Sequence, residues 1–199
     1  MTSTGFRWTG LGALALAGIL AAPAGALTLK RADLNNLVAG NGTIVVASVD
    51  GASSYWNQDK SLILTDFRLR TSQVLKGRVG STLTITQMGG TAGRYTTLIP
   101  GSANLVPGRS YVLFLREERL PGTTGVTTVA EHCQGTFDIE SRSGVLWATS
   151  QAAGEALIPD EEDKDGDADV PGGTKGMSLS DLTRSIQAIV ASGSEGGVK

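Results

Sequence analysis

The 199-residue chain combines 27 glycines with a single Cys, a single His and a net charge of -2. One Cys excludes a disulfide framework and any Cys-based zinc site, and one His leaves little for His-based catalysis or metal binding. The near-neutral charge argues against a dedicated nucleic-acid binder, and the 40% hydrophobic fraction is enough for one folded domain with tails.

The first 26 residues have the pattern of a secretory signal peptide. Arg7 supplies a positive charge, Leu11 to Ala22 form an uncharged apolar stretch of 12 residues, and Ala24-Gly25-Ala26 supplies small residues at a cleavage site. An uncleaved membrane anchor is the alternative, but the apolar stretch is short for a bilayer, and no later run reaches the ~18 residues of a transmembrane helix. We therefore expect a secreted or periplasmic mature chain that begins at Leu27 and has no transmembrane segment.

Residues 27–158 are expected to form one β-rich domain. Its first element is a short helix over Leu29 to Val38, which the Gly40-Asn41-Gly42 run ends. Ile44 to Ala47 is a continuous apolar run, which is typical of a strand buried on both faces. A turn-rich loop is expected over Asp50 to Ser54.

A long strand is expected over Leu62 to Leu75, because its apolar and charged residues alternate. Further strands are expected over Leu83 to Ile85, Tyr95 to Ile99, Tyr111 to Leu115, Val126 to Ala130, Gly135 to Ile139 and Val145 to Ala148, with a loop over Met88 to Gly93. Short strands separated by Gly- and Pro-rich turns predict a mainly β fold, namely a small OB-like or closed antiparallel β-barrel.

The composition changes after Pro159. Residues 159–177 are acidic and Gly-rich, as in a linker, and without the acidic block 160–169 the mature body has 15 basic and 12 acidic residues. Residues 178–192 predict an amphipathic helix that Ser178 and Asp181 cap. Its apolar stripe is expected to dock on the β-domain, the alternative being a partner, and is formed by Leu182, Ile186, Ile189 and Val190.

Four alternate carboxylates in the acidic block resemble part of a calcium-binding loop. They are Asp163, Asp165, Asp167 and Asp169, with Gly166 between them. The twelfth position, counted from Glu161, is Gly172 rather than the bidentate Glu of an EF-hand. We therefore predict no resident cofactor and an acidic tether, with calcium binding as the alternative.

Catalytic patterns are weak in this sequence. His132 and Cys133 are adjacent, so on a strand they would face opposite sides, as a surface His beside a core Cys. The better candidates are for partner binding: Tyr55 and Trp56 in a loop between two strands, and Arg94 at the end of the Gly89 to Arg94 loop. The alternative for Trp56 is that it closes one end of the barrel core.

Several motifs together resemble a known module. They include Val74-Leu75-Lys76-Gly77, Gly89-Gly90, Pro107-Gly108 before Tyr111 to Leu115, and Gln134-Gly135-Thr136-Phe137. The span from Thr43 to Ile139 resembles the netrin and tissue-inhibitor-of-metalloproteinases module. It also resembles a module of exported bacterial proteins of unknown function, some with matrixin-type protease domains. The resemblance implies an OB-like barrel, but those inhibitors use an N-terminal Cys and disulfides that this chain lacks, so zinc-chelating inhibition is not implied.

The sequence favours an exported, non-enzymatic β-domain that binds a protein or cell-envelope partner. The alternatives are a calcium-dependent structural or adhesive protein and a carboxylate-based hydrolase. Nucleic-acid binding is not expected, because the chain has few segments in which basic and aromatic residues alternate.

Overall fold

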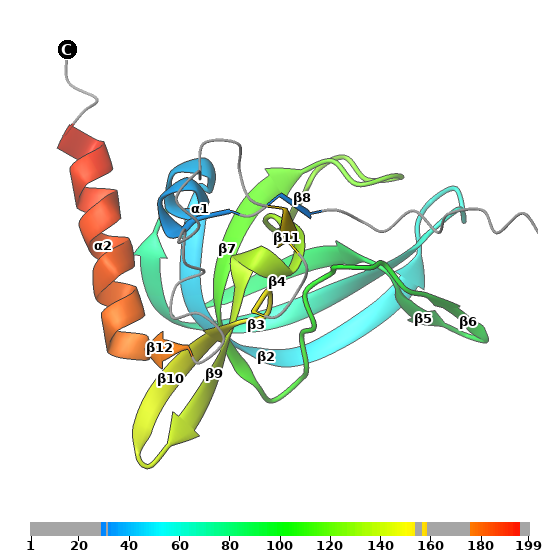
Figure 1. Ribbon diagram of the computed structural model, residues 1–199. Coiled ribbons are helices and arrows are strands. Elements are labelled where there is room, and N and C mark those ends of the chain that lie inside the picture. Colours follow the sequence, from blue (N-terminus) through cyan, green and yellow to red (C-terminus); the bar gives the residue numbers. More distant parts are fainter. Residues whose placement is uncertain (1–28, 31, 154–156, 159–175, 196–199) are drawn as a thin grey trace, which may run out of the picture.

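The computed structural model describes residues 29–30, 32–153, 157–158 and 176–195, which form a mainly β fold with a helix at each end, as the sequence predicts (Figure 1). The predicted signal peptide, residues 1–26, and the acidic block with Asp163, Asp165, Asp167 and Asp169 lie outside the described residues. The elements in chain order are β1 (Leu29–Lys30), α1 (Leu34–Gly40), β2 (Thr43–Trp56), β3 (Ile63–Lys76), β4 (Thr82–Met88), β5 (Gly90–Ala92), β6 (Tyr95–Thr97), β7 (Ser110–Glu118), β8 (Val126–Val129), η1 (His132–Gly135), β9 (Thr136–Arg142), β10 (Val145–Ser150), β11 (Leu157–Ile158), β12 (Met177–Ser178) and α2 (Leu179–Glu195).

The main sheet is antiparallel, in the order β12-β10-β9-β7-β2-β3-β4. One edge of β7 pairs with β2, while its other edge pairs first with β9 and then with β8. The sheet curves until β4 lies beside β8, but among the described residues no hydrogen-bonded ladder joins these two strands. We call this unpaired meeting of β4 and β8 the seam. Register shifts between β2 and β3 add local bending to the curve.

Two hydrophobic cores lie on opposite faces of β2 and β7. Val45, Leu113 and their neighbours face the inside of the curved sheet. Ile44 and Phe114 face the other core, which the helices cover. Both faces of these strands are therefore buried, which explains the continuous apolar runs in the sequence and confirms their assignment as core strands.

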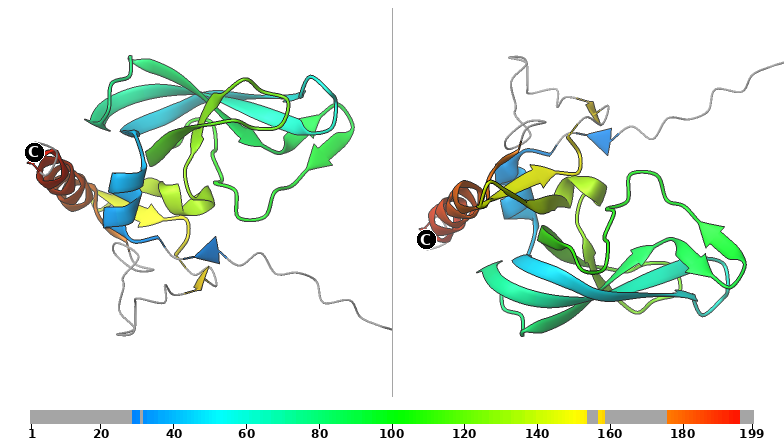
Figure 2. Two further views of the ribbon diagram at one scale, coloured as in Figure 1. Left: turned by 90° about the horizontal axis from the view of Figure 1, so that it is seen from above. Right: turned by 90° about the horizontal axis from the view of Figure 1, so that it is seen from below.

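The helices pack together at one end of the molecule, and the β5–β6 hairpin projects from the other (Figures 1 and 2). In α2, Leu182 and Ile186 are fully buried against the sheet, so the predicted docking of this helix is confirmed. Ser178 Oγ accepts a hydrogen bond from the Asp181 amide at 3.1 Å, as expected of a cap. No helix among the described residues is long and apolar enough to cross a membrane.

Several local expectations are wrong. The first helix begins at Leu34 rather than Leu29, because the Asp33 side chain accepts a hydrogen bond from the Asn36 amide and caps the helix there. The segment Asp50 to Ser54 is strand rather than loop, because pairing with β3 outweighs its turn-rich composition. His132 and Cys133 lie in the short helix η1, not on a strand.

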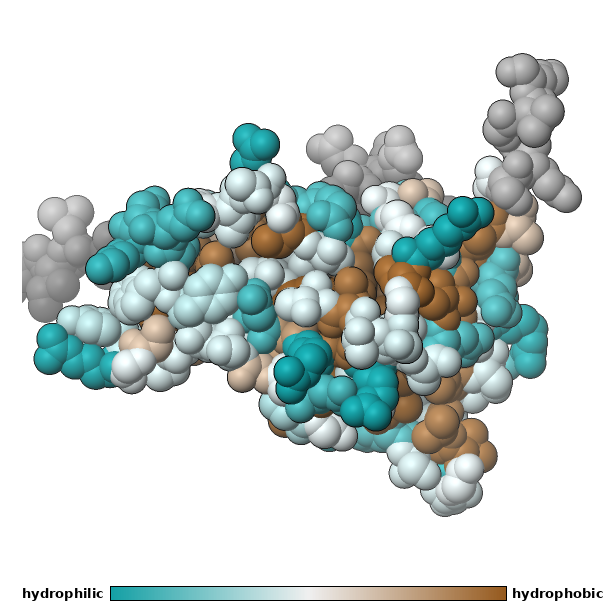
Figure 3. Space-filling view, turned by 180° about the vertical axis from the view of Figure 1, so that it is seen from behind, coloured by the Kyte–Doolittle hydropathy of each residue, from teal (hydrophilic) through white to brown (hydrophobic). Residues whose placement is uncertain are grey.

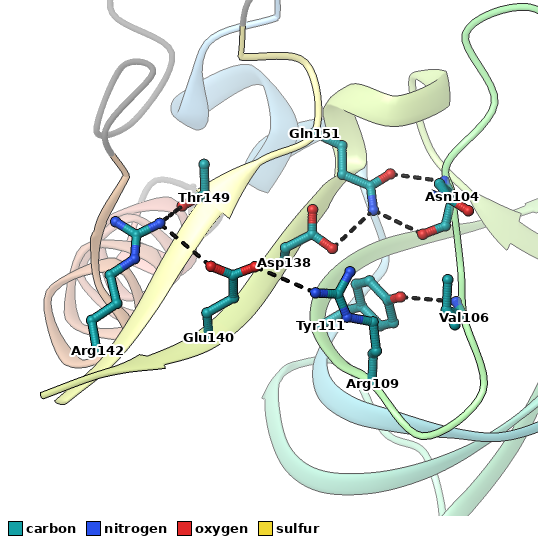
Figure 4. Close-up of polar contacts among 9 residues, drawn as sticks. All are labelled: Asn104, Val106, Arg109, Tyr111, Asp138, Glu140, Arg142, Thr149 and Gln151. Carbon is teal, nitrogen blue, oxygen red and sulfur yellow. Dashed lines mark hydrogen bonds and ion pairs between the residues drawn. The ribbon is translucent and has the colours of Figure 1, made fainter. Parts of the chain in front are cut away.

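The long loop between β6 and β7 is fastened to the sheet by polar contacts (Figure 4). The Gln151 side-chain amide donates to the Asn104 carbonyl at 2.9 Å and accepts from the Asn104 amide at 2.8 Å. The Val106 amide donates to the buried Tyr111 hydroxyl at 2.8 Å. Burial raises the pKa of the Tyr111 phenol. The loop is thereby held in one place against the inner core.

Candidate partner-binding surface

The end of β2 carries the two aromatic residues that the sequence singled out. Tyr55 and Trp56 are the last residues of the strand, opposite Leu64 and Ile63 of β3. They lie on a paired strand and not in the expected loop between strands. Since consecutive strand residues point to opposite faces, the two rings lie on opposite faces of the sheet.

Tyr55 belongs to a polar network on the outer face of the sheet. Its hydroxyl donates to Asp66 Oδ1 at 3.0 Å, and Thr86 Oγ1 donates to the same oxygen at 2.7 Å. Burial and, next, the neighbouring Asp66 raise the pKa of the Tyr55 phenol. The side chain is 38% exposed and is fixed by its hydroxyl. It is therefore oriented by the sheet and lies away from Trp56.

Trp56 meets the β5–β6 hairpin. Its ring lies edge-on to the ring of Tyr95, with the centroids 5.6 Å apart and the planes at 71°. Trp56 is 37% exposed and Tyr95 is 51% exposed. The contact is a favoured aromatic geometry that still leaves about half of the pair open to solvent.

Arg94 completes this cluster from the turn of the hairpin. Its guanidinium carbon lies 5.2 Å from the centroid of the Tyr95 ring, and its Nη2 donates to the Tyr95 hydroxyl at 3.1 Å. We call Trp56, Arg94 and Tyr95 the aromatic patch. The sequence singled out Trp56 and Arg94 but missed Tyr95, whose position beside Arg94 in a short strand was the available signal. Tyr55 is not part of the patch.

Glycines set the position of the hairpin. Gly89 and Gly90 join β4 to β5 with φ angles of 98° and 118°. A Cβ on Gly90 would lie 2.5 Å from Ser54 Oγ and closer still to Thr65 Oγ1. Thr65 Oγ1 donates to the Gly89 carbonyl at 2.6 Å and shares a hydrogen bond with Ser54 Oγ at 2.8 Å. The segment Met88 to Gly93, expected as a loop, thus contains a tight turn at Gly89 and Gly90 and then strand β5. This turn places the β5–β6 hairpin against β2.

A second surface lies at the opposite end of the sheet. On the face in Figure 3, hydrophobic residues gather towards the end that carries α2 and the β9–β10 hairpin. Val145 and Leu146 of this hairpin are each about half exposed. A groove of about 590 Å³ lies beside them and is lined by Val46, Ser72, Gln73, Gly108, Arg109, Ser110, Ile139, Leu146 and Leu179.

A ladder of polar contacts crosses the β9–β10 hairpin beside this groove (Figure 4). Arg109 and Arg142 both pair with Glu140, at 3.4 and 3.6 Å. Arg142 also donates to Thr149 Oγ1 at 3.3 Å. These contacts are solvent-exposed and organise the hairpin, but they do not form a group of catalytic or metal-ligating side chains.

The structure provides little geometry for catalysis or metal binding. His132 is exposed and Cys133 is buried in η1. Within the described part of the chain, no three His, Cys, Asp or Glu side chains converge as metal ligands would. Comparisons with protein-family models, curated proteins and solved structures found no match to this chain.

Proposed function

We propose that the chain is an exported, non-enzymatic β-domain that binds a protein or a cell-envelope component through the aromatic patch. The observation that carries this proposal is the half-exposed Trp56–Tyr95 pair with Arg94 stacked on it. Trp, Tyr and Arg are the residue types that supply most binding energy at protein interfaces. Fixing their side chains before binding lowers the entropy cost of association.

Export is supported by the sequence of residues 1–26, with its positive start, apolar centre and small residues at 24–26. Fusion of these residues to a reporter that is active only outside the cytoplasm tests this part. An active reporter is expected, together with an N-terminus at Leu27 in the processed protein. A reporter that stays inactive would contradict export without bearing on the aromatic patch.

Binding is tested with the chain from Leu27 onwards, immobilised on a support. Purified cell-wall polymer and an envelope-protein fraction from the source cells are the two probes, and any retained component is identified and purified. The variant Trp56→Ala/Tyr95→Ala is expected to bind that component at least roughly thirtyfold more weakly, because truncating an interface anchor costs about 2 kcal/mol or more.

The matched control is Leu146→Ser, which removes an exposed hydrophobic side chain at the other end of the sheet. It is expected to bind like the unmodified chain. Tyr55→Ala, a change to the neighbouring aromatic residue on the opposite face, shows whether the outer face contributes. Equal binding by the double variant and the unmodified chain would refute the role of the patch. Loss of binding in Leu146→Ser alone would assign the interface to the β9–β10 end.

A further inference from the structure

The seam between β4 and β8 encloses a small polar cavity. Its volume is about 90 Å³, enough for roughly three waters at about 30 Å³ each. It is walled by β4, β7, β8, η1 and the loop between β6 and β7, and its polar lining consists of Gln87, Ser102, Arg116, Glu118, Thr128 and His132. Neither the aromatic patch nor the groove beside Leu146 shares a residue with it.

Two buried polar side chains in this cavity have no partner among the residues that the structure describes. Gln87 is 8% exposed and Thr128 is 6% exposed, and both line the cavity. Neither side chain forms a hydrogen bond with any residue that the structure describes, and their polar atoms are not fully closed off from solvent. Buried amides and hydroxyls in folded proteins are almost always hydrogen-bonded. Water or a ligand in the cavity is therefore what these two side chains bond to.

The cavity also contains opposite charges close together. Arg116 lies 3.3 Å from Glu118, and both side chains line the cavity. Arg116 is also 2.7 Å from Glu131. With two carboxylates already beside the guanidinium, a simple anion would meet repulsion from Glu118. A molecule with one charge of each sign would complement both Arg116 and Glu118.

The surrounding structure holds the walls of the cavity in place before any ligand binds. Glu131 and His132 both adopt left-handed backbone angles, with φ of 48° and 57°, which is costly for residues other than glycine. A Cβ on Gly135 would collide with the carbonyl oxygen of Ala130, so this turn is tight. The turn places His132 on the cavity wall and Glu131 on Arg116. Such strain persists where the surrounding structure enforces it, and it is common at binding sites.

The facing wall is held at two points. The Cys133 amide donates to the Gly101 carbonyl at 2.8 Å, which ties η1 to the loop. Three residues further on, Asn104 is clamped by Gln151 (Figure 4). Ser102 and Ala103, which line the cavity, lie between these two anchors. The loop therefore cannot move into the cavity unless at least one of these two anchors breaks.

We propose that the seam cavity binds a small zwitterion of the free amino-acid class. Arg116 receives its carboxylate and Glu118 its ammonium group, while Gln87 and Thr128 bond to the remaining polar atoms. The small volume favours the smallest members of the class, namely glycine, alanine and serine, with their charged groups at the partly exposed Arg116 and Glu118. This site is independent of the proposed partner-binding function.

The test is calorimetric and thermal titration of the chain from Leu27 with glycine, alanine and serine. Saturable heat and a rise in melting temperature that increases with concentration are expected, because a ligand of the folded state stabilises it. N-acetylation and methyl esterification of the best ligand each remove one charge, and both derivatives are expected to bind at least tenfold more weakly. Glycerol and acetate are expected to give no saturable signal.

Two variants locate the site. Gln87→Leu and Glu118→Gln are each expected to weaken binding at least tenfold, while Arg109→Gln, which breaks an exposed ion pair outside the cavity, is the matched control. Glu118 is partly exposed, so its variant keeps the test valid if Gln87→Leu does not fold. Absence of binding by all three amino acids, equal binding of the charge-blocked derivatives, or unchanged affinity in Glu118→Gln would overturn the proposal.

Discussion

Replacing Gly90 by Ala should loosen the attachment of the β5–β6 hairpin to the sheet. Gly90 has a φ of 118°, a conformation that side chains rarely adopt. Its missing Cβ leaves room for the hydroxyls of Ser54 and Thr65. An alanine would push apart the Ser54–Thr65 and Thr65–Gly89 hydrogen bonds, at 2.8 and 2.6 Å. The substitution therefore adds backbone strain and disturbs two hydrogen bonds at once.

The expected cost follows from these two contributions. Backbone strain at positive φ contributes about 1–2 kcal/mol, and two weakened hydrogen bonds add about 1 kcal/mol each. Gly90→Ala should thus lower the free energy of unfolding by about 3–4 kcal/mol. Gly93→Ala is the matched control, because Gly93 has a φ of 64° with nothing within 4 Å of an added Cβ. It should cost about 1–2 kcal/mol, since only the strain remains.

Urea unfolding followed by circular dichroism measures both free energies. In a Trp147→Phe background of the chain from Leu27, Trp56 fluorescence provides a local readout, since the hairpin places Tyr95 against its ring. The Gly90 variant is expected to change the Trp56 spectrum, whereas the Gly93 variant should leave it as in the unmodified chain. Equal costs for the two variants would refute the assignment of Gly90 as a steric crossing point. So would a Gly90 variant with an unchanged spectrum.

Four further predictions concern the helix, its cap, the acidic block and the aromatic patch. Leu182→Ala should lower the free energy of unfolding by about 2–5 kcal/mol, because Leu182 is fully buried, whereas the exposed Gln187→Ala should change it little in the same urea titration. Hydrogen bonding from Ser178 and then Arg184 lowers the pKa of Asp181. Its stabilising effect is therefore complete above the pKa of the unfolded chain and is lost as the pH falls through the lower folded pKa. Asp181→Asn should remove that part of the acid sensitivity in urea titrations between about pH 2 and 6, and an unchanged pH profile would contradict the cap. Calcium titrated calorimetrically into the chain from Leu27 is expected to give no saturable heat at millimolar concentration; saturable heat that disappears in Asp165→Asn/Asp167→Asn would favour the calcium alternative. In a Trp147→Phe background, iodide should quench the half-exposed Trp56, and a fully protected, blue-shifted signal would exclude this ring as a contact residue.

The parts of the fold that the sequence predicts well are those decided by local burial patterns. The runs Ile44 to Ala47 and Tyr111 to Leu115 are apolar at every position because separate cores cover both faces of β2 and β7. The terminal helix is equally predictable, since both its cap at Ser178 and its apolar stripe are patterns among residues close together in the sequence. Such signals need no knowledge of distant residues.

The errors arise where distant residues decide the local structure. The segment Asp50 to Ser54 has the composition of a turn, yet twelve register pairs join β2 to β3 and continue the strand to Trp56. The bulge after Val49 also permits the Arg70–Asp50 ion pair at 2.9 Å. Tyr95 joins Trp56 only because two glycines with positive φ turn the hairpin back onto β2. None of these pairings is visible in a window of neighbouring residues.

The seam cavity is the clearest case of a feature that no sequence window contains. Gln87, Arg116 and Thr128 are ordinary strand residues in isolation, and His132 reads as a surface residue beside a buried Cys. They become a site because β4 meets β8 without pairing and because η1 and the Asn104 clamp keep the gap from closing. A ladder between β4 and β8 would bring these strands to about 4.8 Å and eliminate the gap. The open seam therefore leaves Gln87 and Thr128 facing a cavity instead of a paired strand, and this cavity is where we propose that the zwitterion binds.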